Sequence, residues 1–423
     1  MIFHPALAPY RVDLFNALAP RLDLKVLFLR DRVLSQPFDQ DALRRSVRFE
    51  HGYLLDGWEI RGRGFRKGIR REIARFGPDV VVSQEFSPIS LYVCALRRFG
   101  RPGAAAALWT DDSPHLCRTC GRVRRAARAV ATRWADSLIV CSEATREWFI
   151  GAGIPREKVF SAGILQDEKA FAQSLREVED TARQYAQDLG LSGKKVVLSV
   201  GRLVPVKGVD RIIRAFADGA ARSAPEAVLV IVGDGPQMDY LRQLSASLGI
   251  AQKVRFQGRL EGRSLKAWYL LGDVFVLASN WEPFGAVVNE ALLAGMPVLC
   301  SVYGGASGLI AEGQNGHVFH PEGATLASLI ERVLADAHWA RDRRTLQRPS
   351  LMRTSFEDSV SAFVAAVEHA AAARRGRARR PEPDAGAVEP DAGASGYVRT
   401  CPASSDAGSG CSRSGLDQDC PPR

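Results

Sequence analysis

VGRLVPVKGVDRIIRAF (residues 200–216) joins the end of the apolar run KKVVLSVG (194–201) to a segment whose apolar residues recur at helical spacing. The apolar run predicts a buried strand, and the glycine turn after it carries Arg202 and Lys207 before the helix begins. In an open α/β sheet, ligands bind beyond the carboxyl ends of the strands, and a helix N-terminus there favours phosphate. The segment therefore predicts an α/β fold with an anion site, where two cations would meet the negative charge of a diphosphate leaving group. A surface loop with two solvated cations is the competing interpretation.

The same alternation of apolar runs and helical segments extends over most of the chain. Runs rich in β-branched residues occur at 24–29, 79–83, 105–110 and 136–142, and again at 194–201, 227–233, 253–258, 273–279 and 296–301. Strands that alternate with helices predict a parallel sheet with helices on both faces. Because the rhythm restarts after residue 193 and the chain has 423 residues, we expect two doubly wound domains with separate cores.

Changes of composition set the predicted boundaries. We expect an N-terminal Rossmann-like domain (1–166), a connecting helix that contains the hinge (167–193), a second Rossmann-like domain (194–350), a closing C-terminal helix (351–373) and a disordered tail (374–423). Ser355 and Asp358 form a capping-box-like pair at the start of the closing helix. The tail has almost no aliphatic residues with which to form a core. Only three apolar residues, Met1, Ile2 and Phe3, precede the turn at Pro5, and a truncated start is one explanation for so short a first strand.

Charge is concentrated in the first part of the chain. Of the net charge of +10, residues 1–170 contribute 28 Lys and Arg against 19 Asp and Glu. Much of this excess lies in 61–76 and 122–128, which we interpret as arginine-rich helical segments. A solvated helix face is one interpretation, and binding of an anionic lipid surface or a lipid-linked phosphate is another. No nucleic-acid-binding motif accompanies the charge, so no nucleic-acid partner is expected.

The start of the chain and its apolar runs bear on location. MIFHPALAPYRVDLF has no basic region followed by a long apolar stretch, and no run of 18 uncharged apolar residues could cross a bilayer. We therefore expect a cytoplasmic protein with reduced thiols. The arginine-rich segments predict, in addition, peripheral attachment to the inner face of the cell membrane.

A second informative segment is SNWEPFGAVVNEALLAGMPVLCS (279–301), which begins where the predicted strand 273–279 ends. Glu282 lies on the loop after this strand, and Glu290 lies in the first turns of the following helix. Two carboxylates at one strand-to-helix junction can accept hydrogen bonds from a polyol and from a ribose. Helix N-terminal glutamates that only complement the helix dipole are the alternative.

Taken together, several motifs resemble a known family. GRLVPVKG, VGDGP (232–236), EPFGAVVNEALLAG, YGGASGLI (303–310) and GQNGHVF (313–319) are similar to the nucleotide-sugar domain of glycosyltransferase family 4. The resemblance is dense over residues 194–320 and looser over 1–165. It implies a retaining enzyme of the GT-B fold, in which two facing Rossmann-like domains enclose the active site in their cleft.

The resemblance also implies roles for individual residues. Arg202 and Lys207 would hold the diphosphate, and Glu282 would lie near the transferred sugar. Glu290 would accept hydrogen bonds from the ribose hydroxyls. Backbone groups would complete the site: the amides of Phe284, Gly285 and Ala286 would bind sugar and phosphate, and the backbone at Gly258 and Arg259 would flank the base. The resemblance also implies that a nucleotide diphosphate sugar is the co-substrate. Because retaining members of this fold use no essential metal, no metal cofactor is expected.

The acceptor side of the cleft is expected to contain LWTDDSPHLCRTC (108–120), which follows a first-domain strand. His115 is the candidate acceptor-side or sugar-contacting residue, with Asp111 beside it. A helix cap and a structurally satisfied histidine are the alternative. His115, Cys117 and Cys120 could suggest zinc, but the sequence offers no fourth ligand, so no metal site is predicted.

The resulting hypothesis is a retaining, metal-independent transferase that moves a hexose-like unit from a nucleotide diphosphate sugar to a lipid-linked or cell-envelope saccharide. A nucleotide-sugar epimerase of the same fold and an inactive sugar-nucleotide binder are the alternatives. An epimerase would convert the free donor without an acceptor, whereas a transferase would show at most slow hydrolysis of it.

Overall fold

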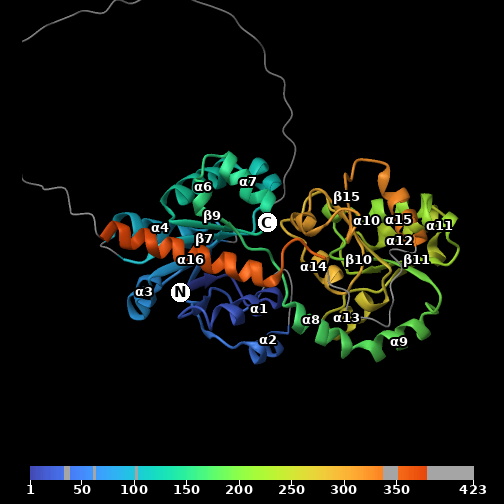
Figure 1. Cartoon of the computed structure of the whole chain (residues 1–423), viewed down its shortest axis with the longest axis horizontal. Coiled ribbons are helices and arrows are strands. Elements are labelled where there is room, and N and C mark those ends of the chain that lie inside the picture. Colours follow the sequence, from blue (N-terminus) through green and yellow to red (C-terminus); the bar gives the residue numbers. More distant parts are fainter. Residues whose placement is uncertain (33–38, 61–62, 101–102, 337–350, 379–423) are drawn as a thin grey trace, which may run out of the picture.

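The computed structural model describes residues 1–32, 39–60, 63–100, 103–336 and 351–378. Two separate parallel sheets form, one from strands before residue 162 and one from strands after residue 194 (Figure 1). All nine predicted apolar runs form strands of these sheets, whereas the strands at 2–4, 50–53, 159–161 and 316–319 were not among the predicted runs. Most strand residues are buried because helices cover the sheets.

The first sheet has seven strands in the order β3-β2-β1-β6-β7-β8-β9. They are β1 (Ile2–His4), β2 (Lys25–Phe28), β3 (Glu50–Tyr53), β6 (Val80–Gln84), β7 (Ala105–Thr110), β8 (Ser137–Val140) and β9 (Val159–Ser161). The short first strand is fully buried and pairs with both β2 and β6. The helices of this first unit are α1 (Pro9–Leu18), α2 (Gln40–Ser46), α3 (Ile69–Phe76), α4 (Pro88–Phe99), α5 (Pro114–Thr119), α6 (Arg122–Trp134) and α7 (Glu143–Gly151).

The second sheet has six strands in the order β12-β11-β10-β13-β14-β15. They are β10 (Lys195–Val200), β11 (Ala227–Val232), β12 (Val254–Phe256), β13 (Val274–Leu277), β14 (Val298–Ser301) and β15 (Gly316–Phe319). The helices are α10 (Val209–Asp218), α11 (Ala220–Ser223), α12 (Met238–Ser247), α13 (Gly262–Leu271), α14 (Ala286–Leu293) and α15 (Thr325–Ala335). In both sheets the strand order reverses beside the first strand, at β1/β6 and at β10/β13, which is where open α/β sheets bind ligands.

Side-chain caps fix where several helices begin. The hydroxyl of Ser87 accepts a hydrogen bond from the amide of Ser90 (3.2 Å) at the start of α4, and Ser113 and Ser142 do the same for α5 and α7. Each cap satisfies an amide at the first turn that has no partner within the helix. The caps lie at the carboxyl ends of β6, β7 and β8, so they fix the loops at the edge where a ligand would bind.

The connecting segment differs from the single helix that we predicted. It consists of two helices, α8 (Glu168–Arg176) and α9 (Glu179–Asp188), with a break at Glu177 and Val178. The prediction of one helix is wrong because Val178 is fully buried and leaves helical geometry, at φ −113° and ψ 8°. The apolar side chain enters the core at the point where the chain changes direction.

The arginine-rich segment 61–76 is also not helical throughout. A hairpin precedes the helix: β4 (Gly57–Ile60) pairs antiparallel with β5 (Arg63–Arg66), and α3 begins only at Ile69. Trp58 stacks on Phe65 across the hairpin, with ring centroids 6.1 Å apart, and Gly68 has a left-handed conformation that separates strand from helix. Cross-strand packing thus overrides the helical composition here, whereas the second predicted segment, 122–128, does lie in α6.

The closing helix α16 (Phe356–Ala378) returns from the second unit and lies across the first sheet (Figure 1). Ser355 and Asp358 form the predicted capping box, with the Ser355 amide 2.8 Å from the carboxylate and the Asp358 amide 3.0 Å from the hydroxyl. In the core, Phe363 of α16 packs against Trp109 of β7, with ring centroids 5.1 Å apart. The predicted end at residue 373 is wrong, because the helix continues through Arg374, which pairs with Asp79. The remainder of the predicted tail, 379–423, lies outside the described residues.

Candidate functional site

The loop after β10 is the centre of the candidate site in the second unit. It contains a short turn of 3₁₀ helix, Pro205–Lys207, followed by Gly208. Gly208 has a left-handed φ of +62° and immediately precedes α10. A Cβ at Gly208 would lie 2.3 Å from the carbonyl oxygen of Ala278, the residue after β13. The close approach requires glycine and brings the loops after β10 and β13 together.

As a consequence, Lys207 and Glu282 meet, although they are far apart in the sequence. The Lys207 ammonium forms an ion pair with the Glu282 carboxylate, and the two side chains are only 19% and 15% exposed. The backbone of Glu282 is fixed from the other side, since its amide donates to Tyr303 (3.0 Å) and its carbonyl accepts from Gly305 (3.1 Å). Arg202 lies on the same loop as Lys207, with an exposed side chain.

The segment Phe284–Ala286 leads into α14. Gly285 has a left-handed φ of +95°, and the helix begins at Ala286, so the amides of its first turns point toward the loop that carries Glu282. The Phe284 side chain has a different role, because it is buried and would contact a Cβ at Gly163 at 3.3 Å. Only the backbone of this segment is therefore available to an anion.

Glu290 lies one turn further along α14 and is already hydrogen bonded. Its carboxylate accepts from the hydroxyl of Tyr269 and from the side-chain amide of Gln166, each at 2.6 Å. Burial raises the pKa of Glu290, and these two donors and Lys266 oppose the shift. Each carboxylate oxygen can accept a second hydrogen bond, so a ligand hydroxyl could join this network. The two donors were not identified from the sequence, since Tyr269 and Gln166 belong to no motif.

The remaining predicted donor-side residues follow β12. Gly258 has φ +69° and accepts a hydrogen bond from the amide of Gly233 (2.8 Å), which joins the loops after β11 and β12. The guanidinium of Arg259 pairs with Glu261, the residue before α13. These two residues therefore lie at the same edge of the sheet as Lys207, two strands further from the switch point.

In the first unit, Asp111 anchors a buried arginine. Its two carboxylate oxygens lie 2.7 and 2.6 Å from Arg11, and Gln84 donates to it at 3.1 Å. The Arg11 side chain is 1% exposed and lies 4.2 Å above the ring of Trp109. Asp111 thus connects α1 to the end of β7, a structural function that the sequence analysis did not predict.

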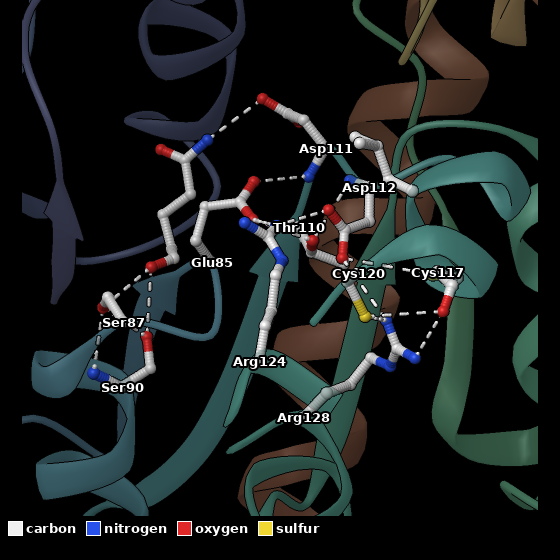
Figure 2. A network of polar contacts seen from close by, with 12 residues as sticks. Glu85, Ser87, Ser90, Thr110, Asp111, Asp112, Cys117, Cys120, Arg124 and Arg128 are labelled. Carbon is white, nitrogen blue, oxygen red and sulfur yellow. Dashed lines mark hydrogen bonds and ion pairs between the residues drawn. The ribbon is translucent and has the colours of Figure 1, made fainter. Parts of the chain in front are cut away.

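Beside Asp111 lies a network of polar contacts around Glu85 that was not predicted from the sequence (Figure 2). The Glu85 carboxylate accepts from the amide of Asp111 (3.0 Å), the hydroxyl of Thr110 (3.3 Å) and the guanidinium of Arg124 (3.0 Å). Arg124 also binds the buried Asp112 at 2.5 Å. Burial and the neighbouring carboxylates raise the pKa of Glu85 to about 7.

The backbone at Glu85 is itself unusual. Its φ is +59°, a left-handed conformation that is uncommon for a residue with a side chain and that concentrates at functional sites. The sequence contains one signal for it, an acidic residue directly after the buried strand β6.

His115 brings the two units together. Its ring stacks on that of Trp281, with centroids 5.9 Å apart and an interplanar angle of 9°. Trp281 immediately precedes Glu282, so the histidine of α5 lies across from the loop that holds the Lys207 ion pair. A second contact between the units joins the thiol of Cys141 to the carbonyl of Pro283, at 3.4 Å. These two contacts place the loop after β7 beside the loop that carries Glu282.

The three side chains that could suggest zinc make separate contacts, since His115 stacks on Trp281. The Cys117 thiol lies 4.0 Å from Asp112, while Cys120 accepts from the guanidinium of Arg128 at 3.3 Å. Within the described ranges, no group of three or more His, Cys, Asp or Glu side chains could hold a metal ion.

No helix in the described part of the chain is long and apolar enough to span a membrane.

Comparison with known proteins is consistent with this geometry. The family described as "Glycosyl transferases group 1" matches residues 181–348, and the "Glycosyl transferase 4-like domain" matches residues 6–162. An uncharacterised glycosyltransferase of Methanocaldococcus jannaschii is 41% identical over 144 residues, which are 34% of this chain and 36% of that protein. A GDP-mannose-dependent alpha-mannosyltransferase of Mycobacterium tuberculosis is 37% identical over 254 residues, 58% of this chain and 61% of that protein.

A solved structure extends the likeness over both units. Anabaena HepE in complex with UDP superposes with a TM-score of 0.61 at 21% identity, over 89% of this chain and 98% of that one. At this identity the likeness concerns the fold. The aligned regions span about a third and 61% of the two relatives named above.

The fold, the site at the facing strand ends and the two family matches together define a glycosyltransferase of the GT-B class. The chain belongs to the group 1 glycosyltransferases.

Proposed function

We propose that this protein is a retaining glycosyltransferase that moves a hexose-like unit from a nucleotide diphosphate sugar to a lipid-linked or cell-envelope saccharide, and that it acts in the cytoplasm. The observation that carries the proposal is the meeting of Lys207, Glu282 and the start of α14 beyond the ends of β10 and β13. This arrangement offers an ammonium and helix amides to a diphosphate at the switch point of the sheet.

In this proposal the cationic residues stabilise the leaving group. Arg202 and Lys207 bind the diphosphate, and the amides of Gly285 and Ala286 add the positive end of a helix dipole. These groups supply the positive charge that the departing phosphate requires, so the reaction does not depend on a metal ion. Glu282 keeps the Lys207 ammonium in place and lies beside the sugar, and Glu290 accepts from the ribose.

The transfer step retains the configuration at the anomeric carbon. The bond from this carbon to the phosphate oxygen breaks, and a bond to the acceptor oxygen forms on the same face of the sugar. The departing phosphate oxygen takes the proton of the acceptor hydroxyl. His115, held against Trp281, faces the sugar from the first unit.

The relatives support the donor class. One is described as GDP-mannose-dependent, and the superposed structure is a complex with UDP. We propose a nucleotide sugar as donor on this basis, and thermal stabilisation by a panel of UDP-, GDP- and ADP-sugars would identify the base and sugar.

Transfer is then measured with the stabilising donor and a saccharide acceptor panel, and the anomeric configuration of the product is read by NMR. Lys207→Ala and Glu290→Ala should each lower transfer at subsaturating donor by roughly thirtyfold, the equivalent of about 2 kcal/mol for one charged contact. Lys253→Ala serves as the matched control, because this ammonium binds the carbonyl of Ala221 (2.6 Å), away from the proposed site.

Three outcomes would contradict the proposal. Wild-type transfer rates in both site variants would refute the residue roles, and an inverted product would refute the retaining step. Conversion of the free donor without an acceptor would instead identify an epimerase.

A further inference from the structure

The β4–β5 hairpin and the helices α3 and α4 enclose an apolar groove that no part of the proposed transfer reaction uses. The groove has a volume of about 890 Å³ and is lined by the aromatic rings of Trp58, Phe65 and Tyr92 together with Ile69 and Ile89. In Figure 1, α3 and α4 lie on the side of the first unit away from the second unit, which therefore does not cover the groove.

Large apolar side chains remain exposed around this groove. Trp58 is 51% exposed, Ile60 is 53% exposed and Tyr92 is 41% exposed. Single exposed apolar residues are common on protein surfaces, but a contiguous group beside an apolar groove marks a binding surface. Trp and Tyr are, in addition, the side chains that concentrate at the boundary between lipid and water.

The charged residues that line the groove all have one sign. Four basic residues line it, Arg66, Lys67, Arg70 and Arg71, and its lining residues include no acidic side chain. Arg66 is committed to the structure, since it binds Glu59 (3.1 Å) and the carbonyl of Leu29 (2.7 Å).

The other basic residues are directed outward. Lys67 and Arg70 are exposed, and the Arg71 side chain is 80% exposed and lies 3.9 Å from Glu72. The Lys67 ammonium lies 5.9 Å from the centre of the Trp58 ring, so cation and aromatic ring form one surface.

We propose that this groove docks the protein on a bilayer surface that contains anionic phospholipid. Trp58 and Tyr92 enter the interface between headgroups and acyl chains, and Lys67, Arg70 and Arg71 bind the phosphates around them. This combination of a small apolar insertion and several cations is what reversible attachment to an anionic membrane requires. The inference rests on the groove alone and does not depend on the donor site.

The hairpin is built to hold this surface rigidly. Trp58 stacks on Phe65 with an interplanar angle of 10°, and Glu59 is bound by Arg30 (2.9 Å) and by Arg66. The hairpin is therefore tied to the loop after β2, and its exposed residues are presented without a large ordering cost on binding.

Sedimentation with vesicles tests the inference on the full chain. The probes are phosphatidylcholine vesicles with and without phosphatidylglycerol, each at low and high salt. We expect binding only when phosphatidylglycerol is present, and loss of that binding at high salt because the phosphate contacts are screened. Binding to neither vesicle at low salt would overturn the proposal.

Variants then locate the surface. Lys67→Gln with Arg71→Gln should weaken binding by about 25-fold, because each cation near an anionic surface contributes roughly a factor of five. The separate variant Trp58→Ser should also weaken vesicle binding. It should remove the quenching of Trp fluorescence by lipids that are brominated in the acyl chain.

Phe99→Ser is the matched control, because Phe99 is also exposed and lies beside Arg98, but at the opposite end of α4 from the groove. Thermal melting of each variant establishes that it is folded. Loss of binding in Phe99→Ser, or full binding in both groove variants, would overturn the assignment.

Discussion

The ion pair between Lys207 and Glu282 yields the sharpest prediction. We consider Lys207→Met, Glu282→Gln and the double variant, which together form a thermodynamic cycle. Both side chains are more than four-fifths withdrawn from solvent. Each single variant therefore leaves a mostly desolvated group without its partner, whereas the double variant leaves no unpaired charge.

The structure sets the expected magnitude. A hydrogen bond to a charged group contributes about 1.5–3 kcal/mol, and an unpaired buried partner adds a desolvation cost. We expect each single variant to lose about 2 kcal/mol of unfolding free energy, and the double variant to lose clearly less than the sum, which corresponds to a coupling of about 2 kcal/mol.

Equilibrium denaturant unfolding measures the three losses, provided the slopes with denaturant agree between variants. The exposed pair of Arg222 and Asp218, at 74% and 65% exposure, is the matched control. The cycle of Arg222→Met and Asp218→Asn should give a coupling below about 0.5 kcal/mol. A Lys207–Glu282 coupling as small as this control would refute the reasoning from burial.

Three further predictions follow from the backbone and from buried titratable groups. Gly208→Ala should lower the unfolding free energy by at least about 2 kcal/mol, because the left-handed backbone and the Ala278 carbonyl both oppose a Cβ. Gly190 is also left-handed but lies in open space, so Gly190→Ala should lose only about 1 kcal/mol. Equal losses in denaturant unfolding would contradict the prediction. The pKa of Glu85 is raised to about 7 from an ordinary value of 4.5, so the folded state holds this proton more tightly and stability falls as pH rises through this interval. Between pH 5 and pH 8, Glu85→Gln should therefore gain stability relative to wild type, on the order of 2 kcal/mol. A stability difference that does not change with pH would disprove this prediction. Burial lowers the pKa of His4 from 6.5 to about 3, so the wild-type protein loses stability as pH falls below about 6.5. Thermal melting of His4→Phe should show a smaller loss over this range, and a loss equal to that of wild type would contradict the prediction.

The local sequence predicted most of the strands because both of their faces are buried. A strand covered by helices on both sides needs a continuous run of apolar residues, and β7 and β11 are such runs with every residue buried. The edge strand β3 has the sequence EHGY and lacks this signal, since among the described strands it pairs with β2 alone. Its existence depends on a neighbour that is remote in the sequence.

The same distinction explains β5, which lies in the segment 61–76 that we predicted as helical. Arginine-rich composition is compatible with a helix, and nothing local in the segment indicates that Trp58 will stack on Phe65 or that Arg66 will bind the carbonyl of Leu29. Contacts across the hairpin and with the first sheet decide its conformation. Propensity is a weak preference that such packing overrides.

For the site, the sequence by itself determined which residues stand at the ends of strands and the starts of helices, because glycine turns and apolar runs are local signals. Only the tertiary structure decided which of these residues meet. Lys207 reaches Glu282 across 75 positions, Arg124 reaches Glu85 across 39, and His115 reaches Trp281 from the other unit. The physical reason is that parallel strands remote in sequence end at one edge of a sheet, so the packing of the strands, and not their order along the chain, brings charged groups within reach of one another.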